Sequence, residues 1–137
     1  MSWVNYYIGK PWKRDAEGPA AFDCKGLVRD VEQKHAGKSV PRLLNVGRLT
    51  DWAAVRESVA RDGWRPVKDR PREFDILTVR GKDGPHVGVF VRIGRRLRVL
   101  HAHGYERDGR SIGRVRHDDL ADLLAGGYGH PRIWRCE

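Results

Sequence analysis

The chain has 137 residues, a size typical of one domain with a single core, and 39% of its residues are hydrophobic. It lacks both a run of about 18 apolar residues and a signal-peptide pattern at its start, so we expect cytoplasmic synthesis, no membrane insertion and no export by the general secretory route. The formal net charge of +9 is compatible with acidic partners of several classes, but the bases are interleaved with acids and form no long stripe, which indicates a solvated basic surface and no specific nucleic-acid site.

Helical patterns dominate the first half of the chain. Apolar spacing and terminating glycines predict three helices, at residues 2–8, 23–36 and 51–61. Asp23 is the expected N-cap of the second helix, and Gly37 is its expected end. Phe22 can pack against Leu27 across that cap.

The second half is rich in β-forming residues separated by glycine-containing turns. The pattern predicts antiparallel strands at residues 74–79, 86–93, 97–103 and 111–116, then a short helix at 118–125 and a final edge strand at 132–136. Helices followed by strands indicate an α+β fold. We expect residues 1–137 to form one domain.

Cys24 lies in the first turn of the second predicted helix. The positive end of a helix dipole and its unpaired N–H groups stabilise a thiolate, which predicts a lowered thiol pKa and a nucleophile. The alternative is a small buried side chain, since Cys24 shares a helix face with Val28 and Val31. With Cys136 as the second cysteine, the chain has too few for a thiolate zinc site, and a single disulfide is a further alternative.

His86 begins a predicted strand on which it shares a face with Gly88 and Phe90. A glycine on that face predicts a close approach by another backbone or a helix end. On the next strand, His101 and His103 share a face, so either could hydrogen-bond the second nitrogen of His86. Periodicity does not separate these two. A metal site built from the three histidines and Cys24 is another alternative.

Three blocks of sequence resemble, in order and spacing, the signature blocks of NlpC-type cell-wall peptidases. They are FDCKGLV at 22–28, PHVGVFV at 85–91 and LHA at 100–102. The segments YIGKPW at 7–12 and FDIL at 74–77 are similar to those that precede the family's nucleophile and base. The ending, from GRVRH at 113–117 to IWR at 133–135, is similar to a subgroup found with phage tail and gene-transfer-agent genes.

The resemblance implies a papain-like fold, with N-terminal helices packed on a C-terminal antiparallel sheet. It implies Cys24 as nucleophile, His86 as general base and His101 as the residue that orients His86, with His103 as the runner-up. The implied reaction cleaves an amide of a peptidoglycan stem peptide, typically between γ-D-glutamate and the diamino acid, without a metal or cofactor.

The same resemblance implies four substrate-binding positions: Trp12, Asp23, Lys25 and His103. Asp23 would recognise the free amino end of the stem peptide. The chain departs from the family pattern where Lys25 replaces a small residue, Trp12 replaces a tyrosine and Phe74 replaces a glycine. A cation at Lys25 would further favour the Cys24 thiolate.

The implied partners are peptidoglycan stem peptides and phage tail-tip proteins, and the implied setting is a virion tail or delivery to the periplasm and cell wall. Two alternatives stay open. One is a structural tail component that no longer cuts, although the retained Cys24, His86 and His101 argue against it. The other is a different papain-like amidase or an acyltransferase, since a fold does not fix its substrate.

Overall fold

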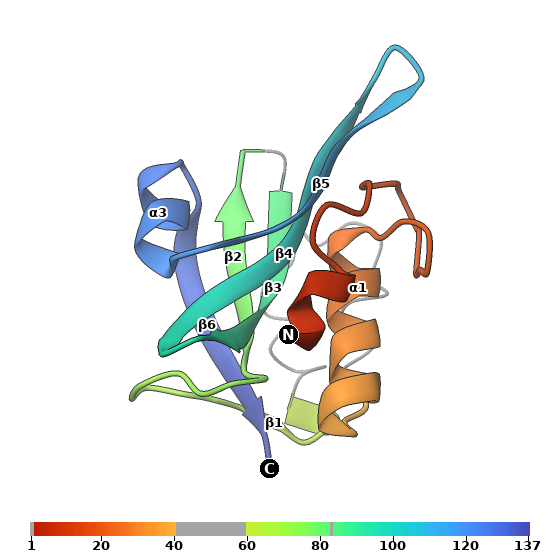
Figure 1. Ribbon diagram of the computed structural model, residues 1–137. Helices are drawn as coiled ribbons and strands as arrows, with labels where there is room; N and C mark the ends of the chain where they lie inside the picture. The colour runs from red at the N-terminus through yellow and green to blue at the C-terminus, as the bar shows by residue number, and fades with distance from the viewer. Residues whose placement is uncertain (1, 41–59, 83) are drawn as a thin grey trace.

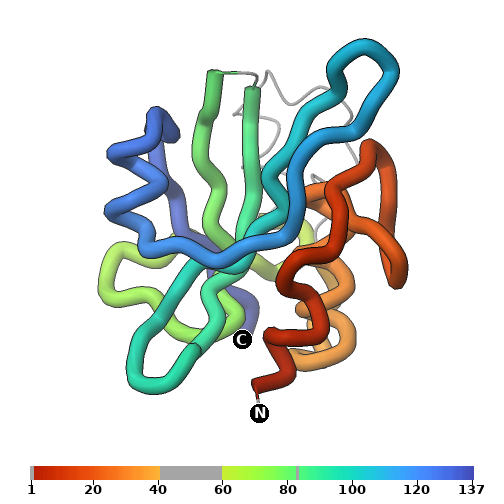
Figure 2. Tube along the Cα trace, turned by 45° about the horizontal axis from the view of Figure 1, so that its top comes forward, coloured from red at the N-terminus to blue at the C-terminus, as the bar shows by residue number. Residues whose placement is uncertain are grey.

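The computed structural model describes residues 2–40, 60–82 and 84–137. The fold is α+β, with a six-stranded antiparallel sheet in the order β1-β6-β2-β3-β4-β5. The strands are β1 (Trp64–Pro66), β2 (Ile76–Gly81), β3 (Gly84–Ile93), β4 (Arg96–Arg107), β5 (Arg110–Asp118) and β6 (Gly129–Cys136). Figure 1 and Figure 2 show β4 and β5 continuing as a long hairpin beyond the body of the sheet.

The first two predicted helices form in the N-terminal half, with adjusted types. The first is a 3₁₀ helix, η1 (Trp3–Tyr6), capped by the Ser2 side chain. The second, α1 (Cys24–Val31), continues as a π-helix, η2 (Glu32–Ala36), and ends at Gly37, whose φ of 66° suits a glycine. The helix predicted at 51–61 lies outside the described residues except for its last two positions. Among the described helices, none combines the length and the apolar character needed to cross a membrane.

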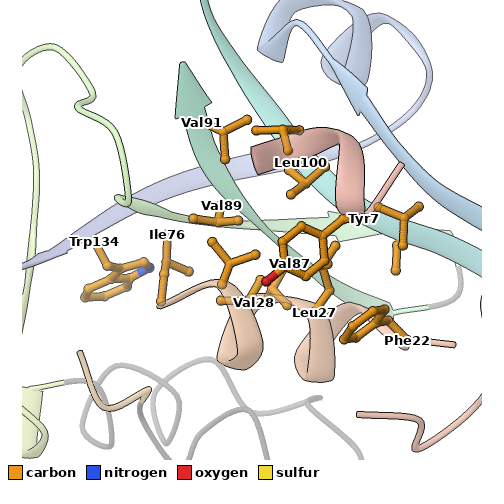
Figure 3. Close-up of a cluster of buried hydrophobic side chains, with 14 of the residues drawn as sticks. Tyr7, Phe22, Leu27, Val28, Ile76, Val87, Val89, Val91, Leu100 and Trp134 are labelled. Carbon is orange, nitrogen blue, oxygen red and sulfur yellow. The ribbon is translucent and has the colours of Figure 1, made fainter. Parts of the chain in front are cut away.

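The sheet has a helix on each face (Figure 1). On one face, α1 and the N-terminal segment pack on the odd-numbered valines of β3, and Figure 3 shows this cluster. Its labelled members are Tyr7, Phe22, Leu27, Val28, Ile76, Val87, Val89, Val91, Leu100 and Trp134. On the other face, Leu123 of α3 (Leu120–Ala125) packs with Leu77, Val79, Phe90 and Val99. The alternation along β3 therefore sorts its residues between two cores.

Two expectations about the architecture need correction. The final strand, β6, is not an edge strand, because the three-residue β1 pairs outside it. Its pairing with β2 shifts register opposite the segment that contains Pro131, which explains how an internal strand accommodates a proline. The arrangement of N-terminal helices on a C-terminal sheet holds only for the α1 face, because α3 lies between β5 and β6 and covers the other face.

Candidate active site

The strands β3 and β4 pair over only part of their length. Their ladder ends where Val89 lies opposite Leu100. Beyond that point, residues 101–107 of β4 pair with β5, and residues 84–88 of β3 pair with β2. Figure 1 shows β4 and β5 turning away from β3 on this side. One end of the sheet is therefore open, so that a helix start and the side chains of both strands can meet there.

Cys24 is the first residue of α1, directly after the cap that fixes the start of the helix. The Asp23 carboxylate accepts the backbone N–H of Gly26 at 2.6 Å and that of Asp15 at 3.0 Å. A Cβ added to Gly26 would lie 2.3 Å from the carbonyl oxygen of Ala16, so the preceding loop packs tightly on the first turn. The predicted N-cap is confirmed. The helix start that carries Cys24 is held from two sides.

The Cys24 thiol is partly exposed and packs against the core cluster of the α1 face. Burial raises its pKa to about 11. Backbone hydrogen bonds from Val87 and Lys25 and the Lys25 charge lower the pKa, while the Asp23 charge raises it. The expectation of a lowered thiol pKa is therefore wrong, because desolvation outweighs the helix start and its neighbouring cation.

The backbone N–H of Val87 can reach Cys24 because β4 has turned away. The N–H of Phe90 donates to the carbonyl oxygen of Asp75, on the β2 side of the strand. Backbone groups of successive residues in a strand point to opposite sides, so those of Val87 point toward the β4 side. At this position β4 no longer pairs with β3. The opened sheet thus supplies a hydrogen-bond donor to the thiol.

His86 and His101 are in direct contact across the opening. Nε2 of His86 lies 2.9 Å from Nδ1 of His101, and the two rings meet edge to face. Burial lowers the pKa of His86 well below its ordinary value, and the nearby His101 and His103 lower it further. Burial also lowers the pKa of His101, against the effect of Asp118. Both imidazoles are therefore neutral near pH 7.

His103 occupies a different position from His101. Its ring centroid lies 6.1 Å from that of His86, and its Nδ1 is 2.6 Å from the hydroxyl of Tyr128. The Tyr128 ring in turn lies stacked on His86, with centroids 4.9 Å apart and 20° between the planes. Geometry thus separates the two histidines that periodicity left equivalent. It places His101, and not His103, within hydrogen-bond distance of Nε2 of His86.

Behind His101 lies a carboxylate held by an arginine. Oδ2 of Asp118 is 2.8 Å from Nε2 of His101, and Arg116 donates to both Asp118 oxygens at 2.8 and 3.0 Å. Burial alone would raise the pKa of Asp118, but the hydrogen bonds from Arg116 and His101 bring it down to about 2. Asp118 is therefore an anion at neutral pH and can only accept hydrogen bonds.

These contacts assign the protons of both imidazoles. Because Asp118 is ionised, Nε2 of His101 must carry the hydrogen of that contact. The other nitrogen of neutral His101 then has a lone pair, so it accepts the hydrogen on Nε2 of His86. Neutral His86 is left with an unprotonated Nδ1. The network therefore leaves one basic nitrogen, on the side of His86 away from His101.

The glycine on the His86 face serves β4 rather than a helix end. A Cβ added to Gly88 would lie 2.6 Å from Cγ1 of Val99, 3.1 Å from the carbonyl oxygen of Leu100 and 3.3 Å from Cβ of His101. Helix α1 packs on the opposite, valine face. The expected close approach at Gly88 is confirmed, and of the two alternatives it is a backbone, that of the neighbouring strand β4, that makes it.

A pocket of about 620 Å³ contains both Cys24 and His86. The residues that line it come from the N-terminal loop, the start of α1, the β2–β3 hairpin, β4 and the segment before β6. They are Trp12, Arg14, Cys24, Gly81, Lys82, Gly84, Pro85, His86, Ala102, His103, Gly104, Tyr105, Gly126, Gly127 and Tyr128. Trp12 packs on Gly104, where an added Cβ would lie 2.3 Å from the indole.

Of the other expected site residues, two line the pocket and two lie at the start of α1 outside the pocket lining. Trp12 and His103 line the pocket. Asp23 is buried, and its carboxylate oxygens accept the backbone N–H groups of the cap. Lys25 is partly buried beside Cys24 and does not line the pocket. Within the described ranges, no three His, Cys, Asp or Glu side chains are arranged to hold a metal ion, and both cysteines are free thiols.

Sequence reasoning missed Asp118, Arg116 and Tyr128. Asp118 was expected to open a helix, whereas it is the last residue of β5. The predicted strand ended at residue 116. If it had been extended to residue 118, strand alternation would have placed Arg116 and Asp118 on the same face, beside the strand that carries the histidines. Tyr128 stands in a glycine-rich segment whose position against β3 depends on the fold, so no local pattern marks it.

No protein-family model matches the sequence, and no curated protein does. A similar solved structure is the crystal structure of an N-acetylmuramoyl-L-alanine amidase from Bacteroides uniformis. The two chains share 14% identity at a TM-score of 0.51, and the match covers 94% of each chain. This likeness shows a common fold over nearly the whole chain. The resemblance to NlpC-type peptidases stays a prediction.

Proposed function

We propose that this chain is a papain-like cysteine hydrolase that cleaves an amide bond in peptidoglycan stem peptides. One observation carries the proposal. A cysteine at a helix start and a neutral histidine line one pocket, and the hydrogen bonds behind that histidine leave its Nδ1 unprotonated. A nucleophile, a base and a third group that orients the base are the parts of thiol-dependent acyl transfer.

In the proposed reaction, the Cys24 sulfur attacks the carbonyl carbon of the amide while its proton passes to Nδ1 of His86. Backbone N–H groups near the thiol, such as those of Lys25 and Val87, stabilise the oxyanion. His86 then protonates the leaving nitrogen as the C–N bond breaks, which leaves a thioester. Water adds to the thioester, gives a proton to His86 and releases the acid as the C–S bond breaks and sulfur regains its proton.

The pKa directions specify how this attack begins. The Cys24 pKa is raised and the His86 pKa is lowered, so the resting pair is a neutral thiol and a neutral imidazole. A preformed thiolate–imidazolium pair is not favoured in the free protein. Proton transfer therefore accompanies carbon–sulfur bond formation, and a substrate carbonyl that enters the pocket supplies the acceptor for the sulfur electrons.

The pocket fits a peptide that carries carboxylates. Arg14 and Lys82 line it, and Trp12, Tyr105 and Tyr128 add apolar walls. We assign Trp12 and His103 to substrate contact and Lys25 to a supporting position beside the nucleophile. Asp23 holds the helix cap, and its recognition of the amino end rests on the resemblance alone. The resemblance favours the bond between γ-D-glutamate and the diamino acid. The structural neighbour is named for a different amide, at the muramoyl–alanine junction.

The resemblance also supplies a setting. We place the activity in one papain-like domain spanning residues 1–137 that acts on the cell wall as part of a phage-like tail, with tail-tip proteins as partners. Co-purification of the chain with phage tail-tip proteins would test this part separately. The chemistry does not depend on the outcome.

The test of the reaction uses the purified chain and peptidoglycan fragments of several wall chemistries. We expect release of a free amine, unaffected by a chelator, and mass spectrometry of the products identifies the bond. Cys24→Ala should abolish the product while it retains the fold, and Cys136→Ser is the matched control that keeps activity. A folded wild-type protein that releases no amine from any fragment would instead favour a structural tail component.

A further inference from the structure

Asp118 occupies the far end of a line of side chains that begins at the pocket. In the β4–β5 ladder, His101 lies opposite Arg116, and Asp118 is two residues further along β5 on the same face. Asp118 therefore reaches His101 diagonally across the two strands. Its carboxylate is 2.8 Å from Nε2 of His101, and the His101 side chain is 2% exposed.

We propose that Asp118 is a positioning residue that sets which nitrogen of His86 is basic, acting through His101 at a distance of two hydrogen bonds. This inference rests on the proposed function of the same site. Asp118 touches neither the pocket nor Cys24, so it acts only through the protons of the imidazoles. Its fixed negative charge requires a hydrogen on Nε2 of His101. This leaves Nδ1 of His101 as an acceptor, and it therefore places the hydrogen of His86 on Nε2.

Arg116 keeps Asp118 in the state that this role requires. The guanidinium binds both carboxylate oxygens, which fixes the plane of the carboxylate and keeps it ionised. The arginine side chain is 54% exposed and the Asp118 side chain 15%, so the ion pair lies between the buried His101 and the surface. A carboxylate in this position also stabilises the positive charge that His86 acquires when it takes the proton from Cys24.

A structural ion pair would predict a different ranking of variants. Asp118→Asn keeps the shape of the side chain but allows its amide to donate to Nε2 of His101. His101 would then carry its hydrogen on Nδ1 and donate to His86, which places the hydrogen of His86 on Nδ1, the base nitrogen. Asp118→Ala removes the carboxylate that fixes the direction of the hydrogen bond from His86 to His101, but it does not reverse that direction. The proposal therefore predicts a larger loss for Asn than for Ala, whereas a structural role predicts the reverse.

The first measurement is independent of activity. Nitrogen-15 NMR of the histidine rings in the whole chain reports which nitrogens carry hydrogen. We expect hydrogen on Nε2 of both His86 and His101 in the wild type and a shift of both to Nδ1 in Asp118→Asn. Asp119→Asn is the matched control, because this neighbouring carboxylate binds Arg96 and Arg98 instead. Unchanged tautomers in Asp118→Asn would overturn the inference.

The second measurement is turnover on the fragment that the wild type cleaves. We expect Asp118→Asn to lose at least about a hundredfold, Asp118→Ala less and Asp119→Asn little, since general base catalysis contributes about 10²–10⁴-fold. Equal turnover in the Asp118→Asn and Asp119→Asn variants would overturn the proposal. If the wild type cleaves nothing while Asp118→Asn still reverses the tautomers, the proposed function fails and the control of the tautomers by Asp118 stands.

The pH profile provides a third readout. The titratable groups beside His86 are His101 and His103 from β4 and Tyr128 from the segment before β6, with Asp118 and Arg116 behind His101. Cys24 from α1 lines the same pocket as His86. Loss of the Asp118 charge should move the acidic limb of the turnover profile to lower pH, because the protonated pair loses its counter-ion. An acidic limb that does not move in Asp118→Ala would count against the proposal.

Discussion

The Tyr128 ring lies on the His86 imidazole as a stacked wall, 4.9 Å between centroids, and its hydroxyl is 2.6 Å from Nδ1 of His103. A Cβ added to Gly81 would lie 2.8 Å from Tyr128, so the absence of a side chain there gives the ring its place. Tyr128 thus connects the segment before β6 to the candidate base. It contributes to the burial that lowers the His86 pKa.

Replacing Tyr128 should separate the stacking from the hydroxyl contact. Tyr128→Phe keeps the wall, so we expect the His86 pKa to stay low. Tyr128→Ala admits water to the imidazole, so the His86 pKa should rise toward its ordinary value because desolvation of the charged form is relieved. Titration of the His86 ring by NMR measures both. A His86 pKa that is equal in the Ala and Phe variants would remove the role of the wall.

The Cys24 thiol should be slow to alkylate at neutral pH. Its pKa is raised to about 11, so the reactive thiolate is a small fraction at pH 7 and grows about tenfold for each pH unit until that pKa is reached. The measurement is the iodoacetamide rate from pH 6 to 11 in Cys136→Ser, in which Cys24 is the remaining thiol. A rate that levels off below pH 8.5 would instead restore the lowered pKa expected from the helix start.

Local patterns predicted the parts of the site that depend on one segment. Asp23 and Gly37 marked the ends of the second helix, because capping and a left-handed terminus are set by the residues themselves. Alternation placed His86 and His101 on neighbouring strands of one sheet. Phe74 departs from the glycine of the family that the sequence resembles, and its φ of 73° is a conformation that favours glycine.

The parts that depend on packing between segments were not predictable. The pKa of Cys24 is set by how deeply the helix start is buried against β3, which no helix pattern contains. The choice between His101 and His103 follows from where β4 leaves β3, since both share a face of the strand. The internal place of β6 depends on β1, a strand of three residues that gives too short a pattern to recognise.

The two β4 histidines should differ in their contribution to turnover. His101→Ala removes the acceptor for Nε2 of His86, so we expect a loss of about a hundredfold or more. His103→Ala removes the contact with the Tyr128 hydroxyl and should cost less than about tenfold. His101→Asn offers a side-chain oxygen as acceptor and should retain more activity than His101→Ala. Thermal unfolding of each variant checks that the ranking does not follow stability.

Glu32 should make the protein less stable as the pH rises from mildly acidic to mildly alkaline. Its side chain is fully buried in the π-helix, and both carboxylate oxygens lack a hydrogen-bond partner among the residues that the structure describes. Burial, and then the charge of Asp75, raise its pKa to about 8 against the effect of Lys38. Between the ordinary value of 4.5 and about 8, the folded chain holds a proton that the unfolded chain has released.

Stability must fall with pH across that window, by up to about 1.4 kcal/mol for each pH unit, and the loss is complete above the folded pKa. Glu32→Gln keeps the shape and cannot ionise, so its stability should not carry this slope. The measurement is the free energy of unfolding in urea at pH 5, 6, 7, 8 and 9 for both proteins. We expect the wild type to lose stability relative to Glu32→Gln up to about pH 8 and to run parallel to it above. Parallel curves from pH 5 onward would show that Glu32 titrates at its ordinary value in the folded chain. Burial of Glu32 would then cause no pH-dependent loss of unfolding free energy.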